Sequence, residues 1–127
     1  MTSVKATLRE QYTIDNTSRE LSWISDEPTE VGGKNLGPKP TELLLSALAS
    51  CKIITVQMYA SRKEWKVDDM SVELTFLEKE GGKTLIEKRI NFTGDLDDKQ
   101  RARLVEISGR CPVVKMLKNS IEFKIVE

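Results

Sequence analysis

The sequence predicts an α+β fold with a largely antiparallel sheet, because alternating segments are interleaved with helical ones. Residues 41–64 contain neither glycine nor proline and are apolar around most of a helical wheel. Residues 70–79 and 84–93 alternate at period two on either side of a Gly-Gly pair, which is typical of a β-hairpin. The expected order is β-β, long helix, β-β, helix, short helix, β.

The N-terminal part predicts two strands followed by a loop. Residues 3–9 and 19–25 alternate weakly, and Asp15-Asn16 between them is a good turn pair. Residues 26–40 hold three of the four prolines and three of the seven glycines, so we expect no helix or regular strand there. Loops of this length are usually disordered or functional.

The helix predicted over 41–64 has only a narrow polar stripe, which includes Ser46, Ser50 and Gln57. A domain this small has little material with which to cover the remaining circumference. Small residues such as Ser46, Ser50 and Ala60 would let another helix approach closely. We therefore expect a second subunit to cover part of this helix, in a homodimer.

The C-terminal part predicts two helices and a last strand. Asp97 and Gln100 form a capping box at the start of a helix that Gly109 ends. Cys111-Pro112 opens a short third helix, because proline is favoured at the first helical position. The alternation of Ile121, Phe123 and Ile125 favours a closing strand.

Composition excludes several classes of function. The 127 residues suit a single domain, 1–127, and lysine plus arginine equals aspartate plus glutamate at 20 each. A net charge of zero argues against nucleic acid or an anionic membrane as partner. The absence of histidine rules out histidine-activated nucleophiles and histidine-ligated metals, and two cysteines cannot form an all-cysteine zinc site. We expect no metal and no cofactor.

The chain is expected to be cytoplasmic. Its first residues are polar and charged, unlike the apolar core of a signal peptide. The most apolar stretch, 43–59, is interrupted by polar residues and is not a convincing membrane span. In the cytoplasm both cysteines would be reduced at rest.

Two cysteines are the candidates for chemistry. Cys51 lies mid-helix on an apolar face, where a buried structural thiol is the simpler interpretation. A reactive Cys51 needs a nearby cation, for which Arg9, Arg19 and Lys52 are available. Cys111 precedes a helix-starting proline, so the helix dipole would favour its thiolate. The same position is equally compatible with a loop cysteine that only caps the helix and has no reactive role. The two could form a peroxidatic and resolving pair, but sequence spacing cannot establish contact.

Other motifs carry weaker signals. Glu42 lies at the start of the long helix, where we expect it to interact favourably with the helix dipole. The glycines of 32–37 do not have the spacing of a phosphate-binding loop.

Five motifs in order carry a family resemblance: DEP at 26–28, GG at 32–33, GPKPTELLLSALASC at 37–51, GDLD at 94–97 and RCPV at 110–113. With these motifs the chain resembles the OsmC/Ohr family of thiol-dependent hydroperoxide reductases and their relatives. The resemblance implies an OsmC-like fold, an intertwined homodimer in which antiparallel-rich sheets wrap central long helices.

The resemblance also implies a mechanism. Cys51 would be peroxidatic and attack an organic hydroperoxide, Cys111 would resolve the sulfenic acid as a disulfide, and a lipoamide-type dithiol or small thiol would reduce it. An N-terminal arginine, Arg19 or alternatively Arg9, would stabilise the thiolate, and a glutamate would orient that arginine. The family's glutamate position holds Thr41 here, with Glu42 one residue later. This pattern resembles the broader OsmC-like branch.

The Thr41 substitution leaves two main hypotheses. The first is a peroxidase acting in oxidative-stress defence, favoured by the retained cysteine pair. The alternative, favoured by Thr41, is a non-catalytic or weakly active dimer that binds a small apolar ligand. A redox switch is a third interpretation. Glu42 lies about 13.5 Å along the helix from Cys51 and points the opposite way, so it could only serve the other subunit's site.

Overall fold

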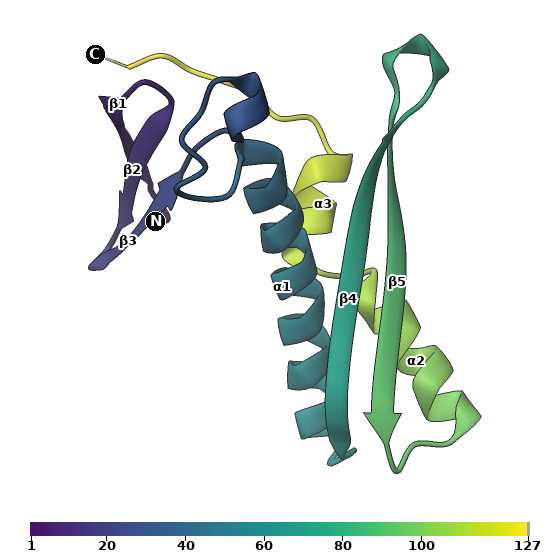
Figure 1. The fold of residues 1–127 in the computed structure, drawn as a ribbon. Helices are drawn as coiled ribbons and strands as arrows, with labels where there is room; N and C mark the ends of the chain where they lie inside the picture. The colour runs from purple at the N-terminus through teal and green to yellow at the C-terminus, as the bar shows by residue number, and fades with distance from the viewer. Residues whose placement is uncertain (127) are drawn as a thin grey trace. The chain divides into compact units, whose positions relative to one another are not determined.

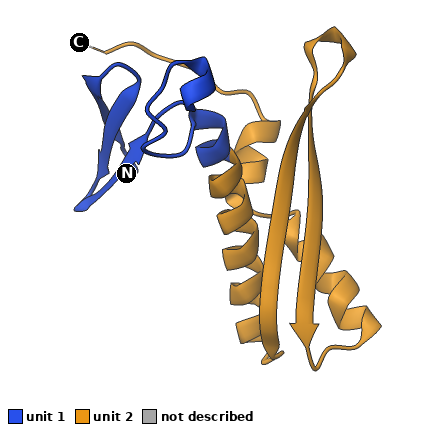
Figure 2. Ribbon diagram, in the orientation of Figure 1, with its two compact units in different colours: residues 1–44 blue, residues 45–127 orange. Residues whose placement is uncertain are grey.

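The computed structural model describes residues 1–126, and the chain divides into two compact units, residues 1–44 and 45–127 (Figure 2). Helices and antiparallel strands alternate as expected for an α+β protein (Figure 1). The three N-terminal strands belong to the first unit. The long helix α1, Pro40–Arg62, begins in the first unit and continues into the second.

The first unit contains a three-stranded antiparallel sheet in the order β1-β2-β3. The strands are β1 (Lys5–Glu10), β2 (Thr13–Ser18) and β3 (Leu21–Ser25). The strands predicted over 3–9 and 19–25 are observed as β1 and β3. The turn predicted at Asp15-Asn16 is wrong, because both residues lie inside β2, a strand that was not predicted, and pair with neighbouring strands. The chain reverses instead near Gln11 and Arg19, which adopt left-handed φ values of 51° and 56°.

The loop between β3 and α1 is compact and held by close backbone contacts. It contains one short 3-10 turn, η1 (Thr29–Val31), where no helix was expected. A Cβ on Gly33 would lie 1.9 Å from the Glu27 carbonyl oxygen, and one on Gly37 would lie 2.3 Å from that of Ile24. These distances are too short for any side chain, so both glycines are required for the loop to close on itself.

In the second unit the C-terminal part of α1 and the helix α2 pack against a long hairpin. Its elements after α1 are β4 (Val67–Glu78), η2 (Glu80–Gly82), β5 (Thr84–Gly94), α2 (Asp98–Ser108) and α3 (Pro112–Lys118). The predicted hairpin and its Gly81-Gly82 turn region are confirmed, with β4 and β5 antiparallel over their length. The predicted capping box of Asp97 and Gln100 is confirmed in both of its hydrogen bonds.

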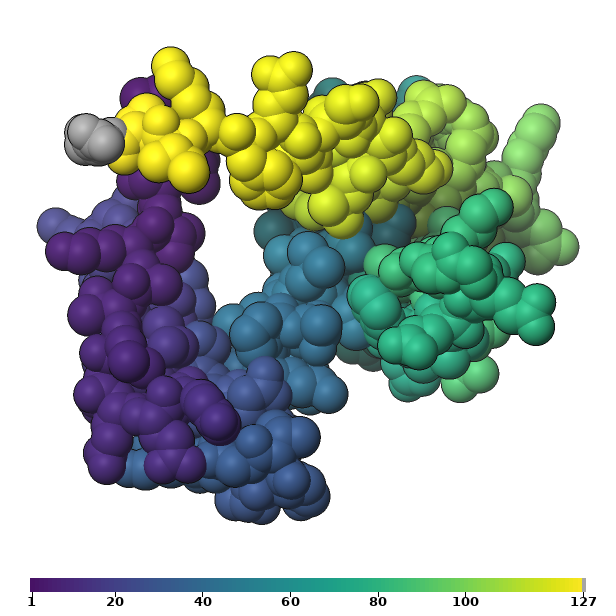
Figure 3. Space-filling model, turned by 90° about the horizontal axis from the view of Figure 1, so that it is seen from above, coloured from purple at the N-terminus to yellow at the C-terminus, as the bar shows by residue number. Residues whose placement is uncertain are grey.

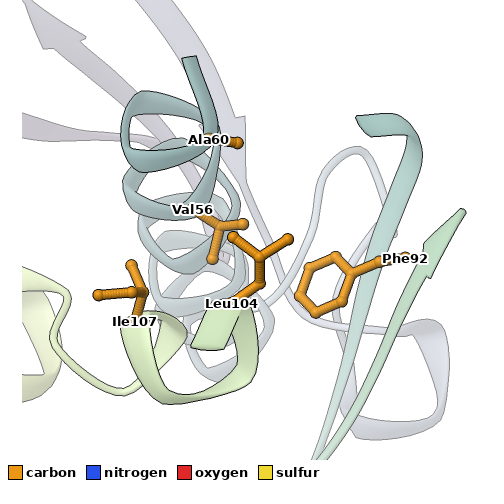
Figure 4. Packing of buried hydrophobic residues seen from close by; sticks show 5 residues of the cluster. All are labelled: Val56, Ala60, Phe92, Leu104 and Ile107. Carbon is orange, nitrogen blue, oxygen red and sulfur yellow. The ribbon is translucent and has the colours of Figure 1, made fainter. Parts of the chain in front are cut away.

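The hydrophobic core of the second unit lies where α1, α2 and β5 meet. Figure 4 shows Leu104 and Ile107 of α2 directed towards Val56 of α1, with Phe92 of β5 beside Leu104. Val56 and Leu104 are 1% and 0% exposed, so the contact is closed to water. On α1 the buried positions recur every fourth residue and form a single stripe, namely Leu48, Lys52, Val56 and Ala60.

The expected closing strand is absent from the described chain. Residues 120–126 have no regular structure and pair with no strand among residues 1–126. Phe123 and Ile125 are 92% and 94% exposed. Alternation favours a strand only where another strand supplies hydrogen bonds, and none of those described does so.

Candidate thiol site

Helix α1 carries Cys51 and Lys52 at adjacent positions that face different surroundings. Lys52 belongs to the buried stripe of the helix and is only 5% exposed, whereas Cys51 is half-buried. Successive helical residues are separated by about 100°, which accounts for the difference. Cys51 therefore lies at the border of the packed face rather than within it.

The outer flank of Cys51 is apolar and largely uncovered in the single chain. Ile54 and Met58, at the neighbouring helical positions, are 53% and 63% exposed. Leu44 and Ala47, which precede Cys51 on the same helix face, are also exposed. The expectation that one subunit cannot cover this helix agrees with these exposures.

Cys111 occupies the position predicted for it, as the N-cap residue of α3 before Pro112. Its backbone is extended there, and its thiol makes no capping hydrogen bond. The residue is fully buried, at 0% exposed. Both cysteines are free thiols.

A hydrogen bond from Lys52 joins the two cysteine-bearing segments. Lys52 Nζ donates to the carbonyl oxygen of Ser108, 3.2 Å away, at the end of α2 and three residues before Cys111. Burial lowers the pKa of Lys52, while the neighbouring thiols of Cys111 and, to a smaller extent, Cys51 raise it. Sequence reasoning named Lys52 as a possible cation for Cys51 but contained no signal for its contact with Ser108, which depends on how α2 packs on α1.

A cavity of about 460 Å³ opens beside this hydrogen bond within the second unit. Its walls come from α1, the hairpin and the α2–α3 segment, which Figure 3 shows in blue, teal to green, and yellow-green. The wall is mostly apolar and includes three lysines but no acidic residue; its members are Leu48, Lys52, Leu74, Thr84, Ile86, Lys88, Gly109, Val114, Leu117 and Lys118. Such a wall suits an apolar molecule that carries a negative charge or a polar head.

The two candidate arginines of the first unit differ in their partners. Arg9 pairs with Asp15 through two hydrogen bonds of 2.5 and 3.0 Å, and this contact raises the pKa of Arg9. Arg19 lies in the turn between β2 and β3 and has no ion pair within 4 Å among residues 1–126. Of the two, Arg19 is therefore the arginine not already committed to a carboxylate.

Glu42 stabilises the beginning of its own helix. Its Oε1 accepts a hydrogen bond of 2.9 Å from the backbone N–H of Lys39, the residue before α1. This is half of a capping box, consistent with the expected role near the helix dipole. Oε2 makes no hydrogen bond within residues 1–126.

Asp26 was noted in the sequence only as part of the DEP motif, and in the structure it is a buried residue that organises the loop of the first unit. Its carboxylate accepts hydrogen bonds from Thr13 Oγ1 at 2.8 Å and from the backbone of Glu27, Lys34 and Leu36. Burial alone would raise the pKa of Asp26, but these hydrogen bonds outweigh it and lower the pKa. The motif therefore shapes the loop. The available sequence signal was an aspartate at the start of a segment rich in proline and glycine.

No cluster of three or more histidine, cysteine, aspartate or glutamate side chains suited to a metal ion occurs within residues 1–126. The chemistry available at the site is that of two thiols and a buried ammonium group.

The OsmC-like protein family model matches residues 32–126. The chain belongs to the OsmC-like family. The match includes the second part of the loop, α1 and both cysteines, but not Arg9, Arg19 or Asp26. No match was found among curated proteins.

Solved OsmC-like structures share this fold. A Psychrobacter arcticus protein of the osmotic-stress and detoxification response is 26% identical, with a TM-score of 0.79 and coverage of 91% of this chain and 88% of that one. An OsmC-like protein from Mycoplasma pneumoniae is 19% identical, with a TM-score of 0.79 and coverage of 93% and 87%. The organic hydroperoxide resistance protein OhrB of Bacillus subtilis is 21% identical, with a TM-score of 0.64 and coverage of 93% and 90%.

Membership also bears on α1, which with Lys63 is long and apolar enough to cross a membrane by length and composition alone. The core helix of a soluble protein passes the same test. The buried stripe of α1 packs against α2 and the hairpin, which accounts for part of its apolar character, while its outer flank stays uncovered in the single chain.

Proposed function

We propose that the chain is a thiol peroxidase that reduces organic hydroperoxides in oxidative-stress defence, with Cys51 as the peroxidatic and Cys111 as the resolving cysteine. The observation that carries the proposal is the link from Lys52, next to Cys51, to Ser108 near Cys111. It ties together two segments some sixty residues apart in an OsmC-like protein. A solved protein of the same fold, from Bacillus subtilis, is named for organic hydroperoxide resistance.

The proposed reaction has three steps. The Cys51 thiolate attacks the terminal peroxide oxygen, the O–O bond breaks, and the alkoxide takes a proton to leave as an alcohol. The Cys111 thiolate then attacks the Cys51 sulfenic sulfur, forming a disulfide while hydroxide leaves and is protonated to water. A dithiol of the lipoamide type, or a small thiol, restores both thiols. The two free cysteines suit a reducing compartment, which we take to be the cytoplasm.

The second subunit belongs to the proposal. The exposed apolar flank of Cys51 would be covered by the other protomer of a homodimer, which would exclude water while admitting an apolar peroxide. Arg19 would supply a cation to the Cys51 thiolate. Glu42 Oε2, not engaged by Lys39, would orient an arginine that serves the other subunit's thiol.

The deciding experiment is a free-thiol count before and after one equivalent of cumene hydroperoxide. Two thiols per chain should disappear, with the disulfide intramolecular on a non-reducing gel. Cys111→Ser should stop at a sulfenic acid that dimedone traps, and Cys51→Ser should lose no thiol. Hydrogen peroxide in the same assay tests the preference for organic peroxides. A wild-type chain that keeps both thiols would contradict the proposal.

A second function is supported by the cavity of the second unit. Its apolar wall with three lysines favours the binding of a small amphipathic anion without turnover, the alternative raised by Thr41. Calorimetry with a fatty acid would detect such binding. Binding by a chain whose thiols do not react with the peroxide would favour this alternative.

A further inference from the structure

Lys52 is a buried cation that the proposed mechanism does not yet use. It lies on the buried stripe of α1 and is 5% exposed. Its Nζ makes one hydrogen bond among the described residues, to the Ser108 carbonyl. A buried ammonium group is costly unless it is paired with an anion. Packing alone would have been served better by an apolar residue at this position.

No carboxylate compensates the charge of Lys52. Within residues 1–126, no aspartate or glutamate oxygen lies within 4 Å of its Nζ. The other charged groups on the wall of the adjoining cavity are Lys88 of β5 and Lys118 of α3, which carry the same sign and lower the pKa of Lys52 further. An anion that compensates a charged Lys52 would therefore be a group other than a carboxylate.

The nearby groups that can become anionic are the two thiols. Cys111 is fully buried three residues after Ser108, and Gly109 and Val114 on either side of it line the same cavity as Lys52. Cys51 lies on α1 outside the buried stripe that contains Lys52, and it is half-buried. Of the two, Cys111 has the larger effect in raising the pKa of Lys52.

We infer that Lys52 is the cation that stabilises the Cys111 thiolate and thereby sets the rate of the resolving step. The inference rests on the proposed function for its role in turnover. The Cys111 thiolate attacks the Cys51 sulfenic acid formed by an organic hydroperoxide; the S–S bond forms and the S–O bond breaks. Lys52 holds the attacking sulfur as an anion until that moment. Cys111 sulfur is oxidised, the sulfenic sulfur is reduced, and hydroxide leaves to be protonated by solvent.

The test measures the pKa of Cys111 alone, without peroxide. Three chains that all carry Cys51→Ser are compared: one with Lys52 unchanged, one with Lys52→Met and one with Lys52→Arg. The ultraviolet absorbance of the Cys111 thiolate is followed against pH in each. Lys52→Met should raise the Cys111 pKa by about one or more, which lowers the thiolate fraction near neutral pH about tenfold. Lys52→Arg should restore the lower value. Lys88→Met is the matched control from the same cavity and should change the pKa much less.

A reciprocal measurement keeps Lys52 in place. The Nζ pKa of Lys52, followed by NMR, should fall when Cys111→Ser is added to the Cys51→Ser chain. An unchanged Cys111 pKa in Lys52→Met would overturn the inference, as would an unchanged Lys52 pKa on removal of Cys111. If Lys52→Met does not fold, the reciprocal measurement decides alone.

A turnover readout connects the inference to the reaction. With both cysteines present, Lys52→Met should still lose its Cys51 thiol to cumene hydroperoxide, but disulfide formation should slow about tenfold and dimedone should trap more sulfenic acid. Failure of the proposed function looks different, because the wild-type chain would then lose no thiol to peroxide while the Cys111 titration would remain measurable.

Discussion

Thr13 Oγ1 donates a hydrogen bond of 2.8 Å to Asp26 Oδ2, and both residues are buried. The bond joins β2 to the loop that precedes α1. The same carboxylate accepts three backbone N–H groups from the loop, so one side chain organises most of it.

Asp26→Asn should destabilise the chain at neutral pH, because an amide cannot accept all of these hydrogen bonds. The lowered pKa of Asp26 means that its stabilising contribution is present above the unfolded-state value of about 3.9 and is lost as pH falls through the folded-state value. Urea unfolding across acidic pH should show the difference between wild type and variant shrinking in that window. Asp68→Asn, at an exposed position of β4, is the control and should show no such difference.

Arg19→Ala should slow alkylation of Cys51 at neutral pH, since removing the cation would raise its pKa towards the free value of about 8.5. A thiol pKa that is higher by one leaves up to about tenfold less thiolate at a given pH. Arg9→Ala is the matched variant and should have little effect, because Arg9 is engaged by Asp15. The assay uses the Cys111→Ser chain, so that one thiol is observed. Slowing by Arg9→Ala alone would transfer the role to Arg9.

Glu42→Ala should lower the free energy of unfolding by about 0.3–1.5 kcal/mol through the loss of the bond to Lys39 N–H. Glu42→Gln keeps an acceptor oxygen and should retain most of that stability. Chemical denaturation of the two variants measures the difference. Equal losses would show that the charge, and not the hydrogen bond, stabilises the helix start.

Thr41→Glu should raise peroxide turnover, because it places a carboxylate where the peroxidases that the chain resembles carry one. Thr41→Gln has nearly the same shape without the charge and should leave turnover near wild type. Initial rates with cumene hydroperoxide and a dithiol provide the comparison. A drop in rate with Thr41→Glu would mean that no arginine is within its reach.

Met58→Glu should convert the proposed dimer into monomers, since it puts a charge on the exposed apolar flank of α1. Lys99→Gln changes the net charge equally at an exposed position of α2 and should leave assembly intact. Light scattering at micromolar concentration reports the mass of each. A folded monomeric wild type would contradict the proposed homodimer.

Elements with local signals were predictable from the sequence. The capping box of Asp97 and Gln100 and the turn near Gly81-Gly82 depend on residues close in the chain, and both are observed. Strand β2 was not predicted, because the turns on either side of it place Gln11 and Arg19 at left-handed φ values. Turns of this kind are recognised in a sequence by glycine or asparagine, which are absent from these two positions. The prediction of a last strand was wrong, because a strand forms only where a neighbouring strand can pair with it, and its own alternation does not supply that neighbour.

The thiol site was predictable in its residue types and not in its contacts. Motif order indicated Cys51 and Cys111 as candidates, and the proline after Cys111 correctly predicted its position at the N-cap of α3. The burial of Lys52 depends on the packing of α2 across α1, a contact between residues more than fifty positions apart. Local patterns contain no information on such distant pairs.

The β4–β5 hairpin has a consequence for how the chain folds. A short turn joins its two strands, so β4 and β5 can pair early in folding at a small cost in chain entropy. Hairpins typically form on the microsecond timescale. The two cysteines lie outside it, one on each side in sequence, and the Lys52–Ser108 hydrogen bond joins their segments only after α2 docks on α1. Until then both thiols are open to oxidation by other chains. Refolding without reductant should therefore yield disulfide-linked oligomers, whereas refolding with reductant should yield chains with both thiols free.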